Sequence, residues 1–392
     1  MENVYSREIA AGVDIETLNR RRIFLGGAGN TGSHFVERAV RNMIQHMFII
    51  DYDKEGYQLH NFAHSSTLLV PSEDLGKPKA ETLAARANEK LLTGGRYIGK
   101  TMNVMDIGPE FLRQFDIALG FFDNQEARAY LAGISRAAGV PFMEVGLSAD
   151  GTWQLQLFDH AKDAPCYCCN MGKKTLAQSC AYTYFNDISN GIAPVTDVSG
   201  AESAAFAMHA IMRFFGREGF PCNEKFVFDA KKLSLERLKQ VKNPACTECS
   251  VQEEFSPETI LVSGSVSETT YAELRDAIEK RTGVPVQICL PYRFVTVDYC
   301  PKCGKKKTLM RPEHRIQMSD VICCACADKE GMPYQSLHVQ AKDQSFDGFD
   351  PLPDNLQELS LYELGFPYGA RIFAMDNTYT EYTVILSDNE VK

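Results

Sequence analysis

Paired cysteines are the most conspicuous chemical feature of the sequence. The chain has 392 residues and 13 cysteines, and several of these follow C-x-x-C spacing. The pairs are Cys166/Cys169, Cys246/Cys249, Cys300/Cys303 and Cys323/Cys326. Two thiolates at this spacing can bind one side of a tetrahedral Zn²⁺ ion, so the pairs predict two structural four-cysteine zinc sites. In the second site, which reads as a zinc ribbon, Cys324 is an alternative ligand to Cys323.

A glycine-rich turn lies between an apolar strand at 22–26 and a helix predicted over 33–46. Its glycines are Gly27, Gly29 and Gly32. Asp51 closes the next apolar strand, 46–50, nineteen residues after the last glycine. Glycines let the backbone approach a phosphate, the helix N-terminus offers N–H groups, and an acid at this distance can bind ribose hydroxyls. The turn therefore predicts a nucleotide-binding βαβ unit, although alone it also fits an NAD-dependent dehydrogenase or a purely structural turn.

The elements that must position these residues alternate between strands and helices. Further strands are predicted at 116–122, 140–145 and 152–158, and further helices at 79–92, 125–138 and 199–216. This alternation predicts an α/β domain with a Rossmann-like, doubly wound and mostly parallel sheet.

A polar, proline-containing stretch near 250–257 predicts a boundary between a domain at 1–252 and a second at 253–392. The second domain has strands around one helix, and a cysteine-bounded insert interrupts it at about 298–330. This pattern predicts a small α+β domain of β-grasp-like arrangement that contains the zinc ribbon.

The charge balance of the chain is acidic, with a formal net charge of −10 and a pI near 5.4. Nucleic-acid binders usually have the opposite balance, so a nucleic acid is not the expected partner. Neither a secretory signal nor an apolar run of eighteen residues is visible, so the sequence predicts a cytoplasmic protein without a membrane anchor.

Several segments, in the same order along residues 5 to about 250, resemble the ubiquitin-activating superfamily of ThiF/MoeB-like adenylyltransferases. They are Tyr5-Ser-Arg7, the run from Asp51-Tyr-Asp53 to Asn61, Asp74-Leu-Gly76-Lys-Pro-Lys79-Ala80, Asp123-Asn124 with Arg128, and the first two cysteine pairs. The compact chain resembles prokaryotic ubiquitin-activating-like enzymes, which are homodimeric, more than the large eukaryotic ones.

The resemblance implies a role for each matching residue. Lys79 and Asn61 would contact phosphate, Asp123 would hold Mg²⁺, and Arg7 would reach the nucleotide of a neighbouring subunit in a homodimer. The implied nucleotide site comprises Gly27, Gly29, Gly32, Asp51, Asp53, Asn61, His64, Lys79 and Asp123. Lys79, Asp123 and Arg7 are the implied catalytic groups for adenylation, because activating a carboxylate with ATP brings two anions together.

One position departs from the pattern of the superfamily. Where the superfamily commonly has Asn-Leu-Asn-Arg-Gln, this chain has Asn61-Phe-Ala-His64-Ser65. Histidine is a weaker and pH-dependent phosphate ligand. His64 is therefore either a group of the nucleotide site or an ordinary loop histidine.

Cys180 lies eleven residues after Cys169, where several members of the superfamily carry a cysteine that accepts the activated carboxylate. A thiolate attacks an acyl-adenylate readily because AMP is a good leaving group. Cys180 is thus the expected site of a thioester or an acyl-persulfide, and the alternatives are a spare thiol or Cys168 as the nucleophile.

The resemblance implies a function in which ATP adenylates the C-terminal carboxylate of a ubiquitin-like protein. Thioester formation on Cys180 and transfer to a conjugating enzyme would follow. The alternatives are a sulfur-carrier adenylyltransferase of the molybdopterin or thiamine type and a non-catalytic partner-binding scaffold. ATP, Mg²⁺ and two structural Zn²⁺ ions are the expected cofactors.

Overall fold

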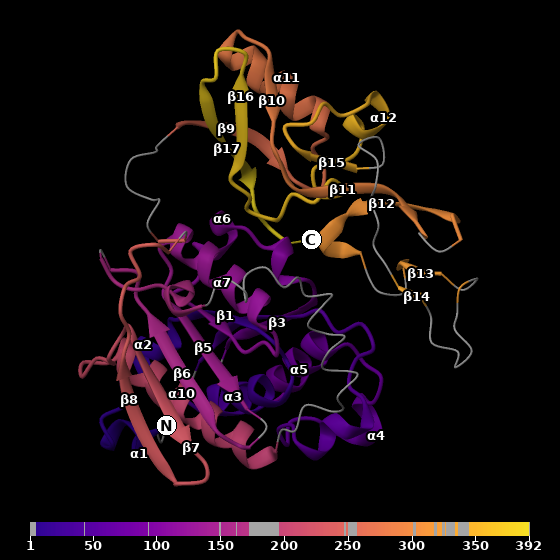
Figure 1. Cartoon of the computed structure of the whole chain (residues 1–392). Coiled ribbons are helices and arrows are strands. Elements are labelled where there is room, and N and C mark those ends of the chain that lie inside the picture. Colours follow the sequence, from indigo (N-terminus) through magenta and orange to yellow (C-terminus); the bar gives the residue numbers. More distant parts are fainter. Residues whose placement is uncertain are drawn as a thin grey trace. The chain divides into compact units, whose positions relative to one another are not determined.

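The computed structural model describes most of the chain. The described residues are 5–42, 44–92, 94–148, 150–161, 163–171, 196–246, 248–249, 257–300, 303–316, 320–323, 326, 334–335 and 345–391. The chain divides into two compact units, each of which is described by itself (Figure 1). The first comprises Met1–Val104 and Leu112–Glu254, and the second comprises Met105–Phe111 and Phe255–Lys392. Most of the stretch where the sequence predicts the domain boundary, 250–256, lies outside the described residues.

An eight-stranded sheet forms the first unit, in the order β3-β2-β1-β4-β5-β6-β7-β8. The strands are β1 (Arg22–Gly26), β2 (His46–Asp51), β3 (Arg96–Thr101), β4 (Ile117–Gly120), β5 (Phe142–Leu147), β6 (Trp153–Phe158), β7 (Glu224–Asp229) and β8 (Ser234–Lys239). The strands from β3 to β5 in this order run parallel, and β6 to β8 are antiparallel to their neighbours. The predicted Rossmann-like, mostly parallel sheet is confirmed.

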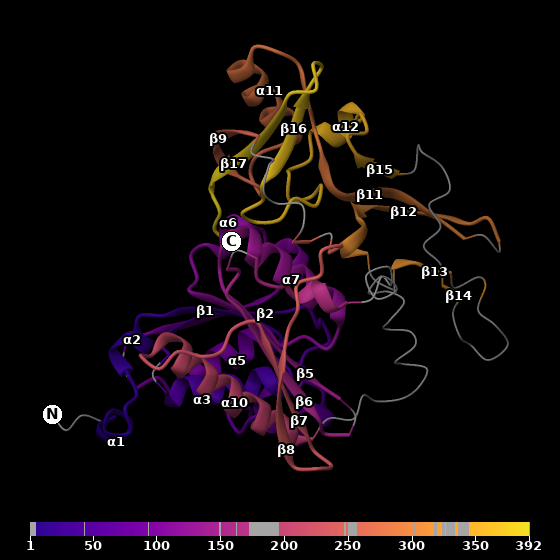
Figure 2. The ribbon, with the colours of Figure 1, turned by 60° about the vertical axis from the view of Figure 1, so that its left-hand side comes forward.

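Helices cover both faces of this sheet (Figure 2). They are α1 (Ser6–Ala10), α2 (Ile15–Asn19), α3 (Asn30–Arg41), α4 (Pro71–Asp74), α5 (Lys79–Asn88), α7 (Gln125–Ala138) and α10 (Asp197–Phe215), with short 3₁₀ turns η1 (Leu59–Ala63) and η3 (Tyr167–Asn170). Helices α3, α5 and α10 pack together on one face, over a core that includes Leu25, Phe35 and Leu119. Helix α7 packs on β4 and β5 from the other face, where its Leu131 lies 3.5 Å from the place that a Cβ atom of Gly120 would take. Among the described residues, no helix combines the length and apolar character that crossing a bilayer requires.

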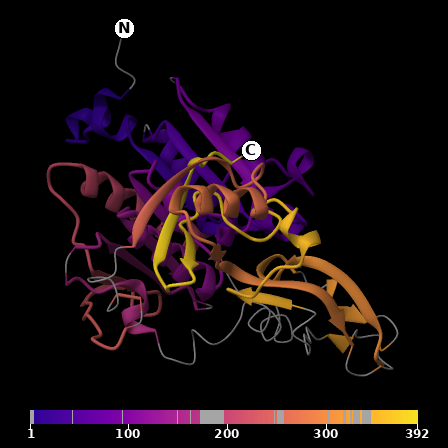
Figure 3. The same cartoon turned by 90° about the horizontal axis from the view of Figure 1, so that it is seen from above.

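The second unit is a smaller α+β structure, as the sequence predicts. Its elements are β9 (Glu258–Ser265), α11 (Tyr271–Thr282), β10 (Val286–Ile288), β11 (Leu290–Tyr299), β12 (Lys306–Pro312), β13 (Ile322–Cys323), β14 (Tyr334–Gln335), β15 (Ser345–Gly348), α12 (Asp354–Gln357), β16 (Ile372–Asp376) and β17 (Glu381–Asp388). A four-stranded sheet has the order β10-β16-β17-β9, and α11 packs on β9 and β10 (Figure 3). A separate three-stranded sheet has the order β12-β11-β15.

A segment from the middle of the first unit's sequence, Met105–Phe111, belongs to the second unit. It includes most of the 3₁₀ turn η2 (Val104–Asp106) and most of α6 (Pro109–Leu112). The carboxylate of Asp106 is buried and accepts hydrogen bonds from His314 Nε2 at 2.9 Å and from Arg315 Nε at 2.8 Å. The segment also pairs with the backbone of Tyr368. Nothing in the sequence pattern predicts this exchange of a segment between the units.

Candidate nucleotide-binding site and cysteine clusters

The site predicted from the glycine turn lies at the carboxyl edge of the parallel strands. Gly26 at the end of β1 is in register with Ile50 on β2 and with Gly120 on β4, so these strands end at one level. The sheet order changes direction here, because β2 and β3 lie on one side of β1 while β4 and β5 lie on the other. Ligands of doubly wound sheets bind in the crevice at such a switch point. Asp51 and Asp123 leave their strands at this edge.

The glycine turn has the close backbone contacts that only glycine permits. Gly27 has a positive φ of 100°, and a Cβ atom there would lie 2.4 Å from the carbonyl oxygen of Phe121. A Cβ atom at Gly32 would lie 2.0 Å from the carbonyl oxygen of Gly27. Gly29, by contrast, has open space at its Cβ position and caps the N-terminus of α3. The turn therefore offers an open, donor-rich helix end that fits a phosphate.

The carboxylate of Asp51 is hydrogen-bonded to the backbone of the glycine turn. Its Oδ2 accepts the backbone N–H of Ala28 at 2.7 Å, and its Oδ1 accepts that of Asp53 at 2.9 Å. Burial raises the pKa of Asp51, while these two hydrogen bonds and the charge of Lys79 act in the opposite direction. Asp51 thus braces the turn, a second role beside the ribose contact that the sequence predicts.

Lys79 and Asp53 form an ion pair, with 2.5 Å between Nζ and Oδ2. Lys79 is the first residue of α5 and its side chain is only 12% exposed. A lysine that is this buried needs a charge partner. Asp53 supplies the partner, so two predicted site residues are brought together in the structure.

Asn61 and His64 lie on the 3₁₀ turn η1 and at its end. Asn61 is buried, and its Oδ1 accepts the backbone N–H of Gln58 at 2.8 Å. Burial lowers the pKa of His64, and the nearby His60 and Lys79 add to this effect. A lowered pKa disfavours the charged imidazole, so His64 is a poor substitute for the positive charge of the arginine that the superfamily commonly has here.

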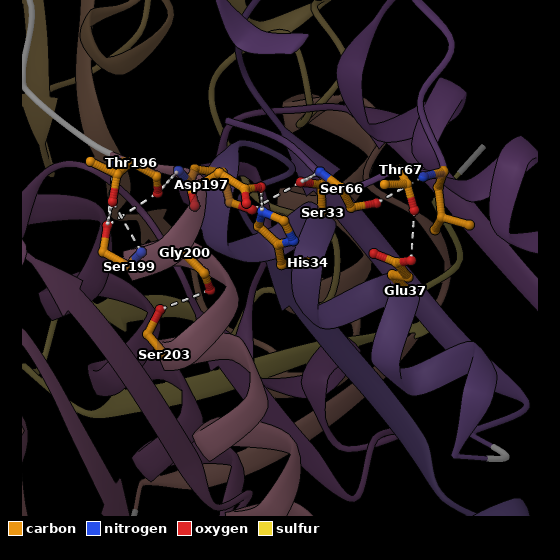
Figure 4. Close-up of polar contacts among 12 residues, drawn as sticks. Ser33, His34, Glu37, Ser66, Thr67, Thr196, Asp197, Ser199, Gly200 and Ser203 are labelled. Carbon is orange, nitrogen blue, oxygen red and sulfur yellow. Dashed lines mark hydrogen bonds and ion pairs between the residues drawn. The ribbon is translucent and has the colours of Figure 1, made fainter. Parts of the chain in front are cut away.

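A polar cluster that the sequence did not predict joins α3 to the N-terminus of α10 (Figure 4). His34 Nε2 lies 3.0 Å from Asp197 Oδ1, and Asn30 Nδ2 donates to the carbonyl of Thr196 at 3.0 Å. The Oγ1 atom of Thr196 caps α10 by accepting the backbone N–H of Ser199 at 3.1 Å. Burial lowers the pKa of His34. These contacts connect the helix of the glycine turn to the start of α10, and the long separation between the partners left no signal in the sequence.

Asp123 lies in the loop between β4 and α7, and its side chain is exposed. Asn124 donates from Nδ2 to Asp123 Oδ1 at 3.2 Å and caps α7 by accepting the N–H of Ala127 at 2.8 Å. A carboxylate oxygen that is open to solvent at this edge suits Mg²⁺, which prefers oxygen ligands.

Within the described residues, Arg7 is not brought to the other predicted site residues. Arg7 is exposed on α1, and in the part of the chain that the structure describes its side chain makes no hydrogen bond or ion pair with them. Cys180 and Cys324 lie outside the described residues.

The predicted cysteine pairs form two compact clusters. In the first, the Sγ–Sγ distances are 3.8 Å for Cys166/Cys169, 3.6 Å for Cys166/Cys246 and 3.4 Å for Cys169/Cys249. In the second they are 3.8 Å for Cys300/Cys326 and 3.6 Å for Cys303/Cys323. Tetrahedral zinc with Zn–S bonds of about 2.3 Å places its sulfurs about 3.8 Å apart. Both clusters could therefore hold Zn²⁺, and Cys323 is a member of the second.

The fold and these sites define an α/β nucleotide-binding protein with a four-cysteine cluster attached to its sheet domain. The ThiF family matches residues 5–251, which is more than half of the chain. The chain therefore belongs to the ThiF family, and the predicted relationship to the ubiquitin-activating superfamily is confirmed.

Similar proteins point in the same direction. The chain is 29% identical over 142 residues to the ubiquitin-activating enzyme E1-like protein of Saccharomyces cerevisiae, covering 35% of this chain and 21% of that protein. It is 30% identical over 114 residues to the NEDD8-activating enzyme E1 catalytic subunit of Arabidopsis thaliana, covering 29% and 24%. The matches thus span less than a quarter of the length of these relatives. The crystal structure of E. coli MccB with ATP has a TM-score of 0.52 at 17% identity, covering 63% of this chain and 75% of MccB, and so shows a shared fold.

Proposed function

We propose that the chain uses Mg·ATP to adenylate the C-terminal carboxylate of a ubiquitin-like protein. In this reaction a carboxylate oxygen attacks the α-phosphorus, the bond to the bridging oxygen breaks, and pyrophosphate leaves with its electron pair. The acyl-adenylate and pyrophosphate are the products. The observation that carries the proposal is the Lys79–Asp53 ion pair beside the glycine turn in a ThiF-family fold.

The charges of the site fit this reaction. The N-terminus of α3 offers N–H groups to the phosphates, and Lys79 exchanges Asp53 for a phosphate oxygen when the nucleotide binds. Asp123 supplies a carboxylate oxygen for Mg²⁺, and Asn61 contacts a phosphate with its amide nitrogen. Asp51 holds the turn in shape and accepts a ribose hydroxyl. Electrostatic stabilisation of this kind acts on charge that develops in the transition state.

The proposal also includes a thioester on Cys180 and a homodimer as the active form. The thiolate of Cys180 attacks the acyl-adenylate, expels AMP and retains the carrier as a thioester, which then passes to a conjugating enzyme. Arg7 completes the nucleotide site of a second subunit, so the active form is a homodimer. The exposure of Arg7 supports this role, because a side chain committed within its own subunit would not be available.

Both cysteine clusters bind Zn²⁺ as structural ions in this proposal. The second unit, with its own zinc cluster, recruits the carrier or the conjugating enzyme. We expect the reaction to take place in the cytoplasm.

A second candidate substrate is a peptide. The microcin C7 biosynthetic enzyme MccB, which shares the fold, has been solved in complex with N-formylated MccA, and microcin biosynthesis is not a ubiquitin-activating reaction. A sulfur-carrier protein is a third, and it would give a thiocarboxylate product instead of a thioester.

ATP–pyrophosphate exchange tests the proposal. Purified protein is incubated with ATP, Mg²⁺, labelled pyrophosphate and a panel of diglycine-ended ubiquitin-like and sulfur-carrier proteins. Carrier-dependent exchange supports adenylation, and a reductant-sensitive adduct of the carrier with this chain identifies a thioester. Absence of exchange with every carrier, together with failure to bind ATP, would leave only the scaffold alternative.

A further inference from the structure

Arg128 fixes the backbone next to Asp123. It lies in the first turn of α7 and donates from Nε to the carbonyl oxygen of Phe122 at 2.9 Å. Its Nη2 donates to the same oxygen. Phe122 directly precedes Asp123, so one guanidinium group holds the peptide that leads into the predicted magnesium ligand with two charge-assisted hydrogen bonds.

Glu144 in turn holds Arg128. Glu144 on β5 is fully buried, and its Oε2 lies 3.5 Å from Arg128 Nη1. Its Oε1 accepts hydrogen bonds from Gln156 Nε2 at 2.6 Å and from Gln154 Nε2 at 3.2 Å. A buried carboxylate with these partners has a fixed position, and it keeps the guanidinium in one orientation.

The space around the guanidinium is closed. A Cβ atom at Gly146 would lie 3.0 Å from Arg128 Nη1, so β5 passes close to the guanidinium, which would have to shift by a few tenths of an ångström for a larger residue to fit there. The Tyr167 hydroxyl contacts the guanidinium from η3, next to the first cysteine cluster. Arg128 is thus held by groups from β5 and η3 while its own helix packs against that cluster.

Hydrogen bonds fix the backbone on both sides of Asp123, while its side chain is exposed to solvent. Arg128 fixes the residue before it, and Asn124 after it caps α7. The Asp123 side chain remains exposed at the carboxyl edge of the sheet. A metal ligand needs this combination, since its affinity depends on groups behind it that set its orientation.

We propose that Arg128 and Glu144 are positioning residues that set the Asp123 carboxylate for Mg²⁺ binding. The inference rests on the proposed function, in which Asp123 holds the magnesium ion of Mg·ATP. Neither residue touches the nucleotide; both act through the Phe122–Asp123 peptide.

The test measures binding of a fluorescent ATP analogue, mant-ATP, as a function of Mg²⁺ concentration. Arg128→Lys should raise the half-saturating Mg²⁺ concentration about tenfold, the size expected for one charge-assisted hydrogen bond. Binding at saturating Mg²⁺ should remain within about twofold of the unmodified protein. Glu144→Gln keeps the shape of the side chain but removes the charge that faces Arg128, and should give a shift of about threefold, at the lower end of the coupling expected for residues in contact. Arg136→Lys, the same change in the last turn of the same helix, is the matched control and should leave the curve unchanged.

A double variant separates positioning from general damage. If Arg128 acts only through Asp123, Arg128→Lys has no further effect on the Mg²⁺ curve in an Asp123→Asn background. A further shift of the same size there would overturn the inference, and so would an unchanged curve for both Arg128→Lys and Glu144→Gln. An unchanged curve for Asp123→Asn alone would remove the magnesium assignment and the inference together. Thermal unfolding shows whether Arg128→Lys folds. If it does not, the same comparison is made with Glu144→Gln in the unmodified protein and in the Asp123→Asn variant.

Discussion

The ammonium group of Lys79 lies 2.5 Å from the carboxylate of Asp53, so the candidate phosphate-binding lysine is neutralised by an acid of the same site. The pair keeps a largely buried cation in place when no polyphosphate is bound. Because Asp53 is itself more exposed than Lys79, the acid can turn to solvent while the lysine stays. In the proposed reaction, nucleotide binding would exchange one anion for another at Lys79, with little loss of solvation.

Lys79→Ala should reduce ATP–pyrophosphate exchange by about a hundredfold or more, the usual effect of removing one group that stabilises transition-state charge. Lys77→Ala is the matched control, because Lys77 is exposed and pairs only at 3.9 Å with Asp74. Both variants are measured with the carrier that supports exchange. Equal exchange rates in the two variants would remove Lys79 from the reaction.

Cys180→Ala should abolish the carrier thioester and leave exchange within about twofold, because the thiol acts only after the adenylate has formed. Cys222→Ala, at a thiol whose pKa burial raises to about 12, should retain the thioester. Intact-mass analysis of the chain after incubation with ATP and carrier checks both results. A thioester that persists in Cys180→Ala would point to another nucleophile, such as Cys168.

Zinc content should fall from two ions per chain to one in either Cys246→Ser or Cys300→Ser. Each change removes a member of one cluster only, so each should destabilise its own unit and lower the unfolding temperature by roughly 5 °C or more. Cys289→Ser serves as the control, since Cys289 belongs to neither cluster. Metal analysis by mass spectrometry gives the count, and an unaltered count in both cluster variants would contradict the metal assignment.

The second unit should lose stability as the pH falls below about 6.5, the ordinary pKa of histidine. Burial lowers the pKa of His314, although its partner Asp106 acts in the opposite direction. Arg315 adds to the lowering and Glu313 opposes it, and the Tyr292 ring packs on the imidazole. The unfolded chain therefore binds more protons than the folded one in this range, so stability is full above pH 6.5 and declines toward the lowered pKa.

His314→Gln keeps a donor for Asp106 but removes the titration. Its stability should accordingly change less between pH 7 and pH 5 than that of the unmodified protein. Hydrogen exchange of the β16 and β17 amides reports on this unit, and His209→Gln, an exposed position on α10, is the control. Parallel pH profiles for His314→Gln and the unmodified protein would show that another group causes the acid instability.

Sequence patterns predicted the βαβ unit and the cysteine pairs because both are local. The turn from Gly27 to Gly32 repeats a short spacing, and each C-x-x-C pair lies within four residues. The β7–β8 hairpin was missed because most of β8 is exposed, so apolar and polar residues do not alternate along it. The ends of α3 differ from the prediction because the helix already begins at Asn30, within the glycine motif, and ends at Arg41.

Contacts between distant residues could not be predicted from one sequence. His34 and Asp197 meet across a gap of 163 positions, and Asp106 and His314 across 208. Arg128 was visible as part of a motif, but its hydrogen bonds to Phe122 depend on the loop geometry. The ion pair of Lys79 and Asp53 likewise requires that α5 begins close to the end of β2.

The exchange of Met105–Phe111 into the second unit limits how the protein can be divided or recombined. A C-terminal fragment expressed by itself would lack Asp106. His314 and Arg315 would then lose the carboxylate that accepts their hydrogen bonds. Grafting this unit onto another ThiF-family domain would require moving two pieces of chain, with the short internal piece inserted between β3 and β4 of the recipient. Swaps of C-terminal units between relatives should therefore succeed only when both pieces travel together.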